Sequence, residues 1–178
     1  RYFIKRAGKA GIEVRVNHGF EAYSSMYDDF IAEKKLKTTS ESVDFMRQYG
    51  TLFTAVLNGE LLSGALMLAD DVHMRWLFAG SRLAAATKEE RSNVSFANRL
   101  VIWEAIKYAK ENGITEFDFG GYYDGNDPDD PRVGINRFKE KFGGERRMYY
   151  TYWKYYSQWY AWGRRIHDFL NVLRAGRR

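Results

Sequence analysis

The sequence contains no cysteine, which excludes disulfide bonds and thiolate metal ligands and suits a reducing compartment such as the cytoplasm. Its histidines, His18, His73 and His167, are scattered and follow no metal-binding spacing. A membrane-spanning helix needs roughly 18 apolar residues, and the longest apolar run here is only Ala65–Ala69. The glycine-framed serine of a nucleophile elbow is also missing. These absences argue against a metal centre, a membrane span and catalysis by a side-chain nucleophile.

The charge of the chain is positive overall and uneven along its length. The formal net charge is +5, and Asp168 is the only acidic residue after Arg146. A basic segment of this kind attracts phosphates or an anionic membrane surface. The 178 residues and 45% hydrophobic content predict one globular domain with a substantial core. Because the chain begins with Arg1 rather than methionine, we expect a part of the protein to precede it.

The first half of the chain shows the pattern of an α/β domain. A basic helix over 1–10 is followed by a strand, Ile12–Val16, and two amphipathic helices follow over Phe20–Leu36 and from Ser40 to Gly50. Three strands are expected next: Thr51–Leu57, Glu60–Ala69 and Val72–Ala79. Asn58-Gly59 favours a tight hairpin turn between the first two strands. The three strands are therefore predicted to form an antiparallel meander.

The second half continues with a crossover. After a polar loop over 81–95, the helix Phe96–Asn112 is apolar on most sides, and the strand Thr115–Phe119 follows it. A strand–helix–strand order predicts a parallel pair joined by a right-handed crossover. A final strand, Glu145–Trp153, and a helix, Lys154–Ala175, complete the predicted elements.

The stretch Gly113–Glu145 is the most informative part of the chain. Its strand is broken by Gly120-Gly121, a polar loop over 123–131 follows, and a short helix, INRFKEKF, lies between Gly134 and Gly143-Gly144. One more crossover in an α/β domain would show the same pattern. The pattern alone therefore does not assign a function.

Two sequence motifs in and before this stretch resemble those of a known family. FDFGG and GINRFKEKFGGE resemble the closing motif of the FemABX aminoacyltransferases, and ANRLVIWEAIKYAKENGITE resembles their central helix. The likeness covers Ala97–Tyr149 well and the rest loosely. It implies an α/β (α+β) fold of GNAT type: a mixed twisted sheet with an N-terminal antiparallel meander, a central crossover helix and a splayed parallel pair. It also implies cytoplasmic transfer of an amino acid from aminoacyl-tRNA to a peptidoglycan precursor, with no cofactor and no metal.

The resemblance also suggests a domain organisation. Residues 1–11 would form a lead-in helix from a preceding GNAT-like domain that the sequence lacks, residues 12–153 the acyltransferase domain, and residues 154–178 a basic aromatic helix. An ordinary terminal helix explains the first segment equally well.

Site residues follow from the resemblance residue by residue. Lys139 is a candidate catalytic residue, because the family's Phe-Lys pair lies near the acceptor end of aminoacyl-tRNA, where a cation stabilises developing charge. Asp118, beside the strand break, is the second candidate, as the proton acceptor for an attacking amine. The substrate-binding candidates are Phe138, Arg137, Gly120, Gly121 and Tyr122. Each main candidate also has a structural alternative. Lys139 could be a solvated helix lysine, Phe138 a core residue, and Asp118 a strand carboxylate bonded to the backbone.

Coenzyme A is the donor in the main rival hypothesis. GNAT enzymes bind its pyrophosphate in a glycine-containing turn at the start of the central helix. Here the segment Arg91–Phe96 has Val94 and Phe96 in the glycine positions, which hinders approach of a phosphate to the backbone. A coenzyme A-dependent N-acyltransferase with an altered phosphate loop is one alternative. A noncatalytic substrate- or RNA-binding half of a larger enzyme is another.

The C-terminal segment MYYTYWKYYSQWYAWGRR combines aromatic and basic residues. Two functional interpretations are open: peripheral contact with a membrane near a lipid-linked precursor, and contact with RNA through stacking and charge. A helix packed on the sheet is the third alternative. The acidic loop Asp124–Asp130 lacks the pattern of an EF-hand and is expected to be solvated.

Overall fold

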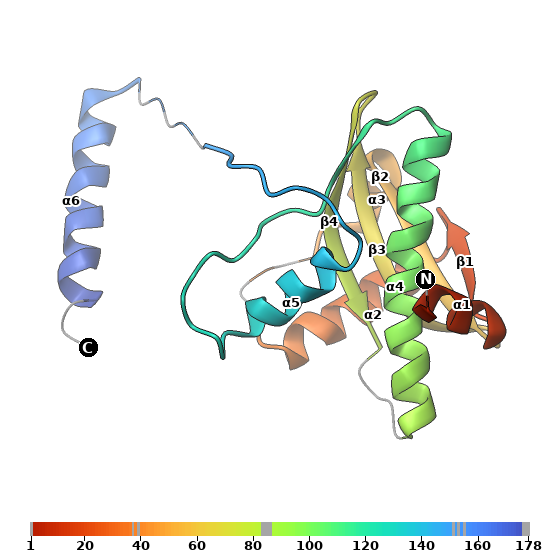
Figure 1. Cartoon of the computed structure of the whole chain (residues 1–178). Helices are drawn as coiled ribbons and strands as arrows, with labels where there is room; N and C mark the ends of the chain where they lie inside the picture. Colours follow the sequence, from red (N-terminus) through yellow and green to blue (C-terminus); the bar gives the residue numbers. More distant parts are fainter. Residues whose placement is uncertain are drawn as a thin grey trace. The chain divides into compact units, whose positions relative to one another are not determined.

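The computed structural model describes residues 2–36, 38, 40–82, 87–150, 152, 154 and 156–175, without the side chains of 161 and 168–175. It divides into two compact units, Arg1–Gly143 and Gly144–Arg178. The first unit contains the sheet and most of the helices (Figure 1). The described part of the second unit contains one helix, α6 (Gln158–Ala175).

The described residues of the first unit form a five-stranded sheet in the order β1-β2-β3-β4-β5. The strands are β1 (Glu13–Val16), β2 (Gly50–Leu57), β3 (Glu60–Ala69), β4 (His73–Ser81) and β5 (Glu116–Asp118). Neighbours from β1 to β4 are antiparallel, whereas β4 and β5 are parallel. Asn58 and Gly59 have φ angles of 51° and 84°, as a tight primed turn requires. The predicted meander and parallel pair are both confirmed.

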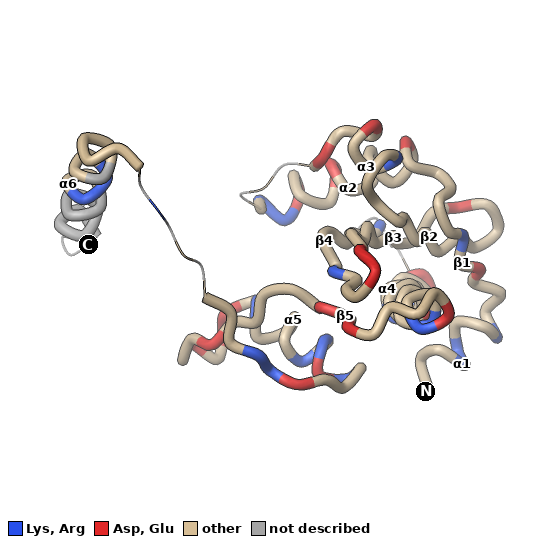
Figure 2. Tube along the Cα trace, turned by 90° about the horizontal axis from the view of Figure 1, so that it is seen from above, with Lys and Arg blue, Asp and Glu red and all other residues tan. Residues whose placement is uncertain are grey.

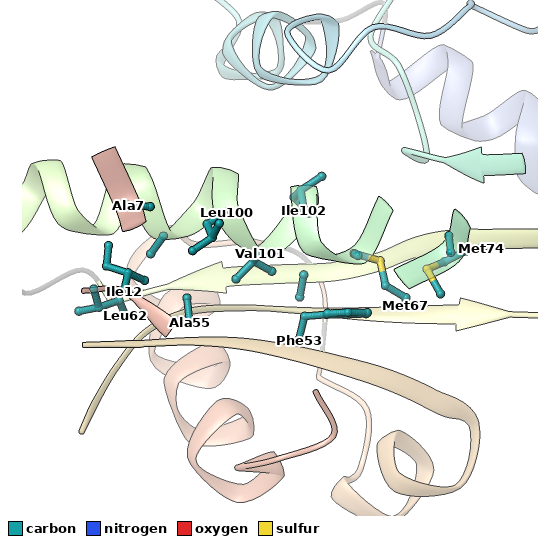
Figure 3. Close-up of a cluster of buried hydrophobic side chains, with 14 residues drawn as sticks. Ala7, Ile12, Phe53, Ala55, Leu62, Met67, Met74, Leu100, Val101 and Ile102 are labelled. Carbon is teal, nitrogen blue, oxygen red and sulfur yellow. The ribbon is translucent and has the colours of Figure 1, made fainter. Parts of the chain in front are cut away.

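Helices cover both faces of this sheet (Figure 1). They are α1 (Tyr2–Lys9), α2 (Phe20–Glu33), α3 (Val43–Tyr49), α4 (Lys88–Glu111) and α5 (Pro131–Glu140). The helices α1 and α4 pack on one face, where Phe53, Met67 and Val101 belong to the larger buried cluster (Figure 3). The helices α2 and α3 pack on the other face. Since side chains alternate along a strand, Leu52 and Leu66 point into this second cluster.

Two sequence-based predictions of elements are wrong. The region 81–95 is not a loop throughout, because α4 begins at Lys88 and includes Arg91–Phe96. The side chain of Thr87 accepts a hydrogen bond from the backbone N–H of Glu90, and Glu90 in turn accepts one from the N–H of Thr87. This capping box explains the early start. The final strand Glu145–Trp153 is also not found, since the described residues 145–150 and 152 form no strand and residues 151 and 153 lie outside the described part.

We predict that Gly64→Ala destabilises the domain by about 1–3 kcal/mol, as overpacking in a core does. A Cβ atom at Gly64 would lie 2.5 Å from the ring of Tyr23, which is completely buried between α2 and β3. Gly8→Ala is the control, because Gly8 lies in α1 with no other atom within 4 Å of such a Cβ. That change should stabilise the protein by about 0.5–1 kcal/mol. Urea unfolding measures both, and equal stability of the two variants would contradict the prediction.

Candidate active site

The candidate site lies where β4 and β5 separate. The parallel ladder pairs His73, Met74 and Arg75 with Glu116, Phe117 and Asp118. Beyond that point β4 continues to Ser81, whereas β5 ends at Asp118. The backbone after β5 turns at Gly120, which has a φ of 73°. Only glycine adopts this conformation readily. The end of a parallel strand in an α/β sheet is a common place for a ligand.

The carboxylate of Asp118 fixes this turn. Its Oδ1 accepts a 2.7 Å hydrogen bond from the backbone N–H of Gly120, and its Oδ2 lies 3.7 Å from Nε of Arg75. Bonding to backbone is the alternative that the sequence left open for this residue. A carboxylate has about four acceptor positions, so these contacts leave capacity for a further partner.

The helix α5 begins on a well-defined cap. Asp130 is the N-cap residue, and its Oδ1 accepts a 2.8 Å hydrogen bond from the backbone N–H of Arg132, while Pro131 occupies the first turn. Hydrogen bonds from the Arg132 guanidinium and backbone lower the pKa of Asp130 to about 2. The sequence suggested that this helix begins at Gly134. In the structure it begins three residues earlier, at Pro131.

Four hydrogen bonds tie the loop Gly121–Tyr123 to α5. The Nζ atom of Lys139 donates to the backbone carbonyl of Gly121 at 2.6 Å, and the hydroxyl of Tyr122 donates to Glu140 at 2.5 Å. The side-chain amide of Asn136 accepts from the N–H of Tyr123 at 3.1 Å and donates to its carbonyl at 2.6 Å. Asn136 is buried, with 7% of its surface exposed. The loop after β5 is thus held along one side of α5.

Lys139 lies in a half-buried position above an aromatic ring. Its Nζ atom is 5.5 Å from the centre of the Trp76 ring on β4. Burial lowers the pKa of Lys139 from its ordinary value, and the negative charge of Asp118 opposes this shift. A partly desolvated ammonium interacts more strongly with an anion than a lysine in bulk water does.

Phe138 forms the aromatic side of the same site. Its ring packs edge-on against Trp76 at 6.1 Å and tilted against Phe142 at 5.3 Å. The guanidinium of Arg99 on α4 lies 5.4 Å from the Phe138 ring. Phe138 therefore packs against the core and also positions the residue that follows it, Lys139.

The structure brings most of the predicted site residues together. Lys139, Phe138, Gly121 and Tyr122 meet between α5 and the loop, and Gly120 forms the turn that leads into it. Arg137 points elsewhere: it is exposed, and it has no hydrogen bond, ion pair or ring contact among the described residues. Sequence reasoning missed the contacts of Asn136, Trp76 and Arg99. The only local signal for any of them is an uncharged asparagine inside a short basic helix.

The first turn of α4 has features that disfavour binding of the pyrophosphate of coenzyme A. The N–H groups of Thr87 and Glu90 already bond within the capping box. Glu89 and Glu90 offset the positive charges of Lys88 and Arg91 at the start of this helix, so its side chains add no net positive charge for a phosphate. Val94 and Phe96 lie further along the helix and pack against the core. The sequence placed the obstacle in the two bulky residues, whereas in the structure the helix start is formed by the capping box of Thr87 and Glu90.

We expect calorimetric titration with acetyl-coenzyme A to show no binding tighter than about 1 mM, which corresponds to roughly 4 kcal/mol. The reason is the capped first turn, in which Glu89 and Glu90 offset the charges of Lys88 and Arg91 and leave no net side-chain charge to attract an anion. Measurements at low and high salt separate weak nonspecific attraction from a formed site. A micromolar Kd that survives high salt would contradict this expectation.

Comparisons with known proteins show which family and which solved structures this chain is similar to. A family model described as acetyltransferase (GNAT) domain matches residues 1–140. Lipid II:glycine glycyltransferase of Staphylococcus saprophyticus is 32% identical over 115 residues, which cover 63% of this chain and 25% of that protein. The chain thus corresponds to about a quarter of the length of this curated relative.

Solved structures show the same fold. FemX has a TM-score of 0.59 at 15% identity, over 78% of this chain and 51% of FemX. An aminoglycoside acetyltransferase from an uncultured soil metagenomic sample has a TM-score of 0.53 at 11% identity, over 81% of this chain and 97% of that chain.

The chain belongs to the acetyltransferase (GNAT) domain family, since the family model covers most of its length. It is accordingly an acyltransferase domain. The family model and the glycyltransferase relative support the predicted Fem-type GNAT-like domain. The structural similarity to FemX and to the aminoglycoside acetyltransferase confirms the predicted fold class.

Proposed function

We propose that this domain takes part in the transfer of an aminoacyl group from aminoacyl-tRNA to an amine of a peptidoglycan precursor. The observation that carries the proposal is the half-buried ammonium of Lys139 where β4 and β5 separate. The capping box at the start of the central helix supports it, because it occupies N–H groups that a coenzyme A phosphate would use. The name of the staphylococcal relative specifies glycine and lipid II for that protein. Here we propose only the class of donor and acceptor.

The reaction needs no side-chain nucleophile. The neutral amine of the acceptor attacks the ester carbonyl, a C–N bond forms, and the C–O bond to the tRNA ribose breaks. The proton of the amine passes to the oxygen of the leaving ribose. Such a step depends on positioning and on stabilisation of the negative charge that develops on oxygen.

Lys139 and Asp118 have distinct roles in this proposal. The Lys139 ammonium uses one donor on the carbonyl of Gly121 and has two more for the developing oxyanion or a nearby tRNA phosphate. Asp118 accepts the amine proton transiently with the capacity that Gly120 and Arg75 leave. Direct contact of both residues with substrate is part of the proposal.

The remaining candidates bind substrate. Phe138 and Trp76 form an apolar wall for the acyl group, and Gly120-Gly121 allow a ligand to approach the backbone closely. Tyr122 and the exposed Arg137 would contact the polar parts of the donor. In the complete protein, residues 1–11 would join a preceding GNAT-like domain, and a lipid-linked acceptor would bring the domain to the cytoplasmic side of the membrane.

A transfer assay with the complete protein tests this function. The protein is incubated with tRNA charged with labelled amino acids and with a lipid-linked muropeptide, and mass spectrometry identifies the product. We expect the stem peptide to gain an amino acid only when charged tRNA is present. Acyl transfer from acetyl-coenzyme A without tRNA would overturn the proposal and establish the coenzyme A-dependent alternative.

A noncatalytic role is the second candidate, and one observation favours it. The chain covers 51% of FemX, so a site divided between two domains would be incomplete here. In that case the isolated chain should bind the precursor or the tRNA without transferring anything. Restored activity on mixing with the preceding domain would then show that both halves form the site.

A further inference from the structure

Aromatic side chains in the unit Gly144–Arg178 are exposed to an unusual degree. Trp159 is 90% exposed and Trp162 is 66% exposed. Further exposed aromatic side chains precede or adjoin them: Tyr149, Tyr150, Tyr152, Tyr156 and Tyr160. A contiguous exposed apolar patch usually marks a surface that binds another molecule.

The helix α6 places part of this patch on one side. Trp159, Trp162 and Ile166 have the spacing i, i+3 and i+7, so they share one helical face, and Ile166 is also exposed. At 3.6 residues per turn, Arg164 lies on the opposite side and Arg165 at the border of the apolar face. The helix is therefore amphipathic, with tryptophan on one side and arginine on the other.

The charge of the unit Gly144–Arg178 is strongly positive. Its acidic residues are Glu145 and Asp168, and its basic residues are Arg146, Arg147, Lys154, Arg164, Arg165, Arg174, Arg177 and Arg178. Figure 2 shows the basic positions that α6 carries. A segment of this composition is complementary to an anionic surface.

We propose that this unit binds the surface of a bilayer containing anionic lipids, with α6 lying in the plane of the interface. Trp159, Trp162 and Ile166 would enter the boundary between headgroups and acyl chains, and the arginines would contact lipid phosphates. Tryptophan and tyrosine prefer this boundary, because one end of each side chain is apolar and the other is polar.

A lipid surface fits these observations better than RNA does. RNA-binding modules stack bases on aromatic rings, whereas Ile166 on the apolar face of α6 has no ring for stacking. A continuous apolar helical face is what an interfacial helix requires. This inference does not depend on acyl transfer, so it stands or fails separately from the proposed function.

Sedimentation with lipid vesicles tests the proposal. The full chain is mixed with vesicles of phosphatidylcholine alone or with about one third phosphatidylglycerol, and bound protein is measured together with the shift in tryptophan emission. We expect binding to the anionic vesicles to be at least tenfold stronger and to weaken with salt. The triple variant Trp159→Ser, Trp162→Ser, Ile166→Ser should lose at least tenfold in partitioning, and Arg164→Gln with Arg165→Gln should lose several-fold.

Trp103→Ser supplies the matched control, because Trp103 is a partly exposed tryptophan of α4 outside this unit. It should bind vesicles as strongly as the parent. Equal binding to neutral and anionic vesicles, or an equal loss in the Trp103 variant, would overturn the proposal. Tight binding of deacylated tRNA together with no binding to vesicles would overturn the proposal and identify RNA as the ligand of this unit.

Discussion

Lys139→Met is expected to lower aminoacyl transfer by more than about tenfold, which requires only about 1.4 kcal/mol of lost transition-state stabilisation. Methionine keeps the packing of the lysine stem on Trp76 but removes the ammonium from the end of β5. The variant also loses one partly exposed hydrogen bond to Gly121, so its stability should fall by no more than about 1 kcal/mol. Single-turnover transfer by the complete protein and a thermal unfolding curve measure the two effects.

Lys141→Met is the matched control for this experiment. Lys141 is an exposed lysine at the C-cap of the same helix, two residues further along and on a different face. It should retain parental activity. Equal losses in both variants would indicate a diffuse basic surface, whose effect should weaken with salt. Full activity of Lys139→Met would show that the role implied by the Fem-type motif does not apply here.

The fold is largely predictable because its signals are local. Asn58-Gly59 dictates a tight turn between the strands Thr51–Leu57 and Glu60–Ala69, and a helix that is apolar on most sides before a short strand dictates a crossover. Each of these predictions needs only residues that are close in the sequence. The structure confirms them as β2, β3, α4 and β5.

The two wrong elements have different physical causes. The first turns of α4 are polar, and a search for apolar periodicity passes over the capping box Thr87–Glu90 that starts the helix. The high aromatic content of Glu145–Trp153 is typical of a strand, but strand formation depends on pairing with a neighbour, which side-chain composition does not guarantee. In this segment the β-propensity of the residues predicts a strand less well than the presence of a neighbouring strand to pair with would.

The candidate site is predictable only in part. Lys139 and Phe138 follow from a motif that is continuous in the sequence. Trp76 does not, because its position under Lys139 depends on the pairing of β4 with β5 and on where α5 lies. The role of Asn136 likewise depends on a contact with Tyr123 across the loop. Residues of this second kind decide where the ammonium of Lys139 points.

Asn136→Ala is expected to destabilise the domain by about 2–4 kcal/mol, because each unsatisfied buried polar group costs about 1–3 kcal/mol. The change removes the side-chain partners of both the N–H and the carbonyl of Tyr123, in hydrogen bonds that are partly buried. The loop would move away from α5, and the carbonyl of Gly121 would no longer hold Lys139. Transfer by the folded fraction should therefore fall as well, mainly in kcat.

Two further variants make this result specific to the buried contact. Asn112→Ala removes an exposed asparagine whose amide donates one hydrogen bond to the carbonyl of Tyr108, and it should cost less than about 1 kcal/mol because water replaces the donor. Asn136→Asp places a carboxylate against the Tyr123 carbonyl, which favours the protonated acid and raises the pKa of the new side chain in the folded state. The folded protein then binds more protons than the unfolded chain. The loss in the free energy of unfolding relative to the parent should therefore shrink as the pH falls toward the raised pKa. Urea unfolding from pH 7 to pH 5 measures this trend, and an Asn136→Ala variant within about 0.5 kcal/mol of the parent would show that the loop is held by other contacts.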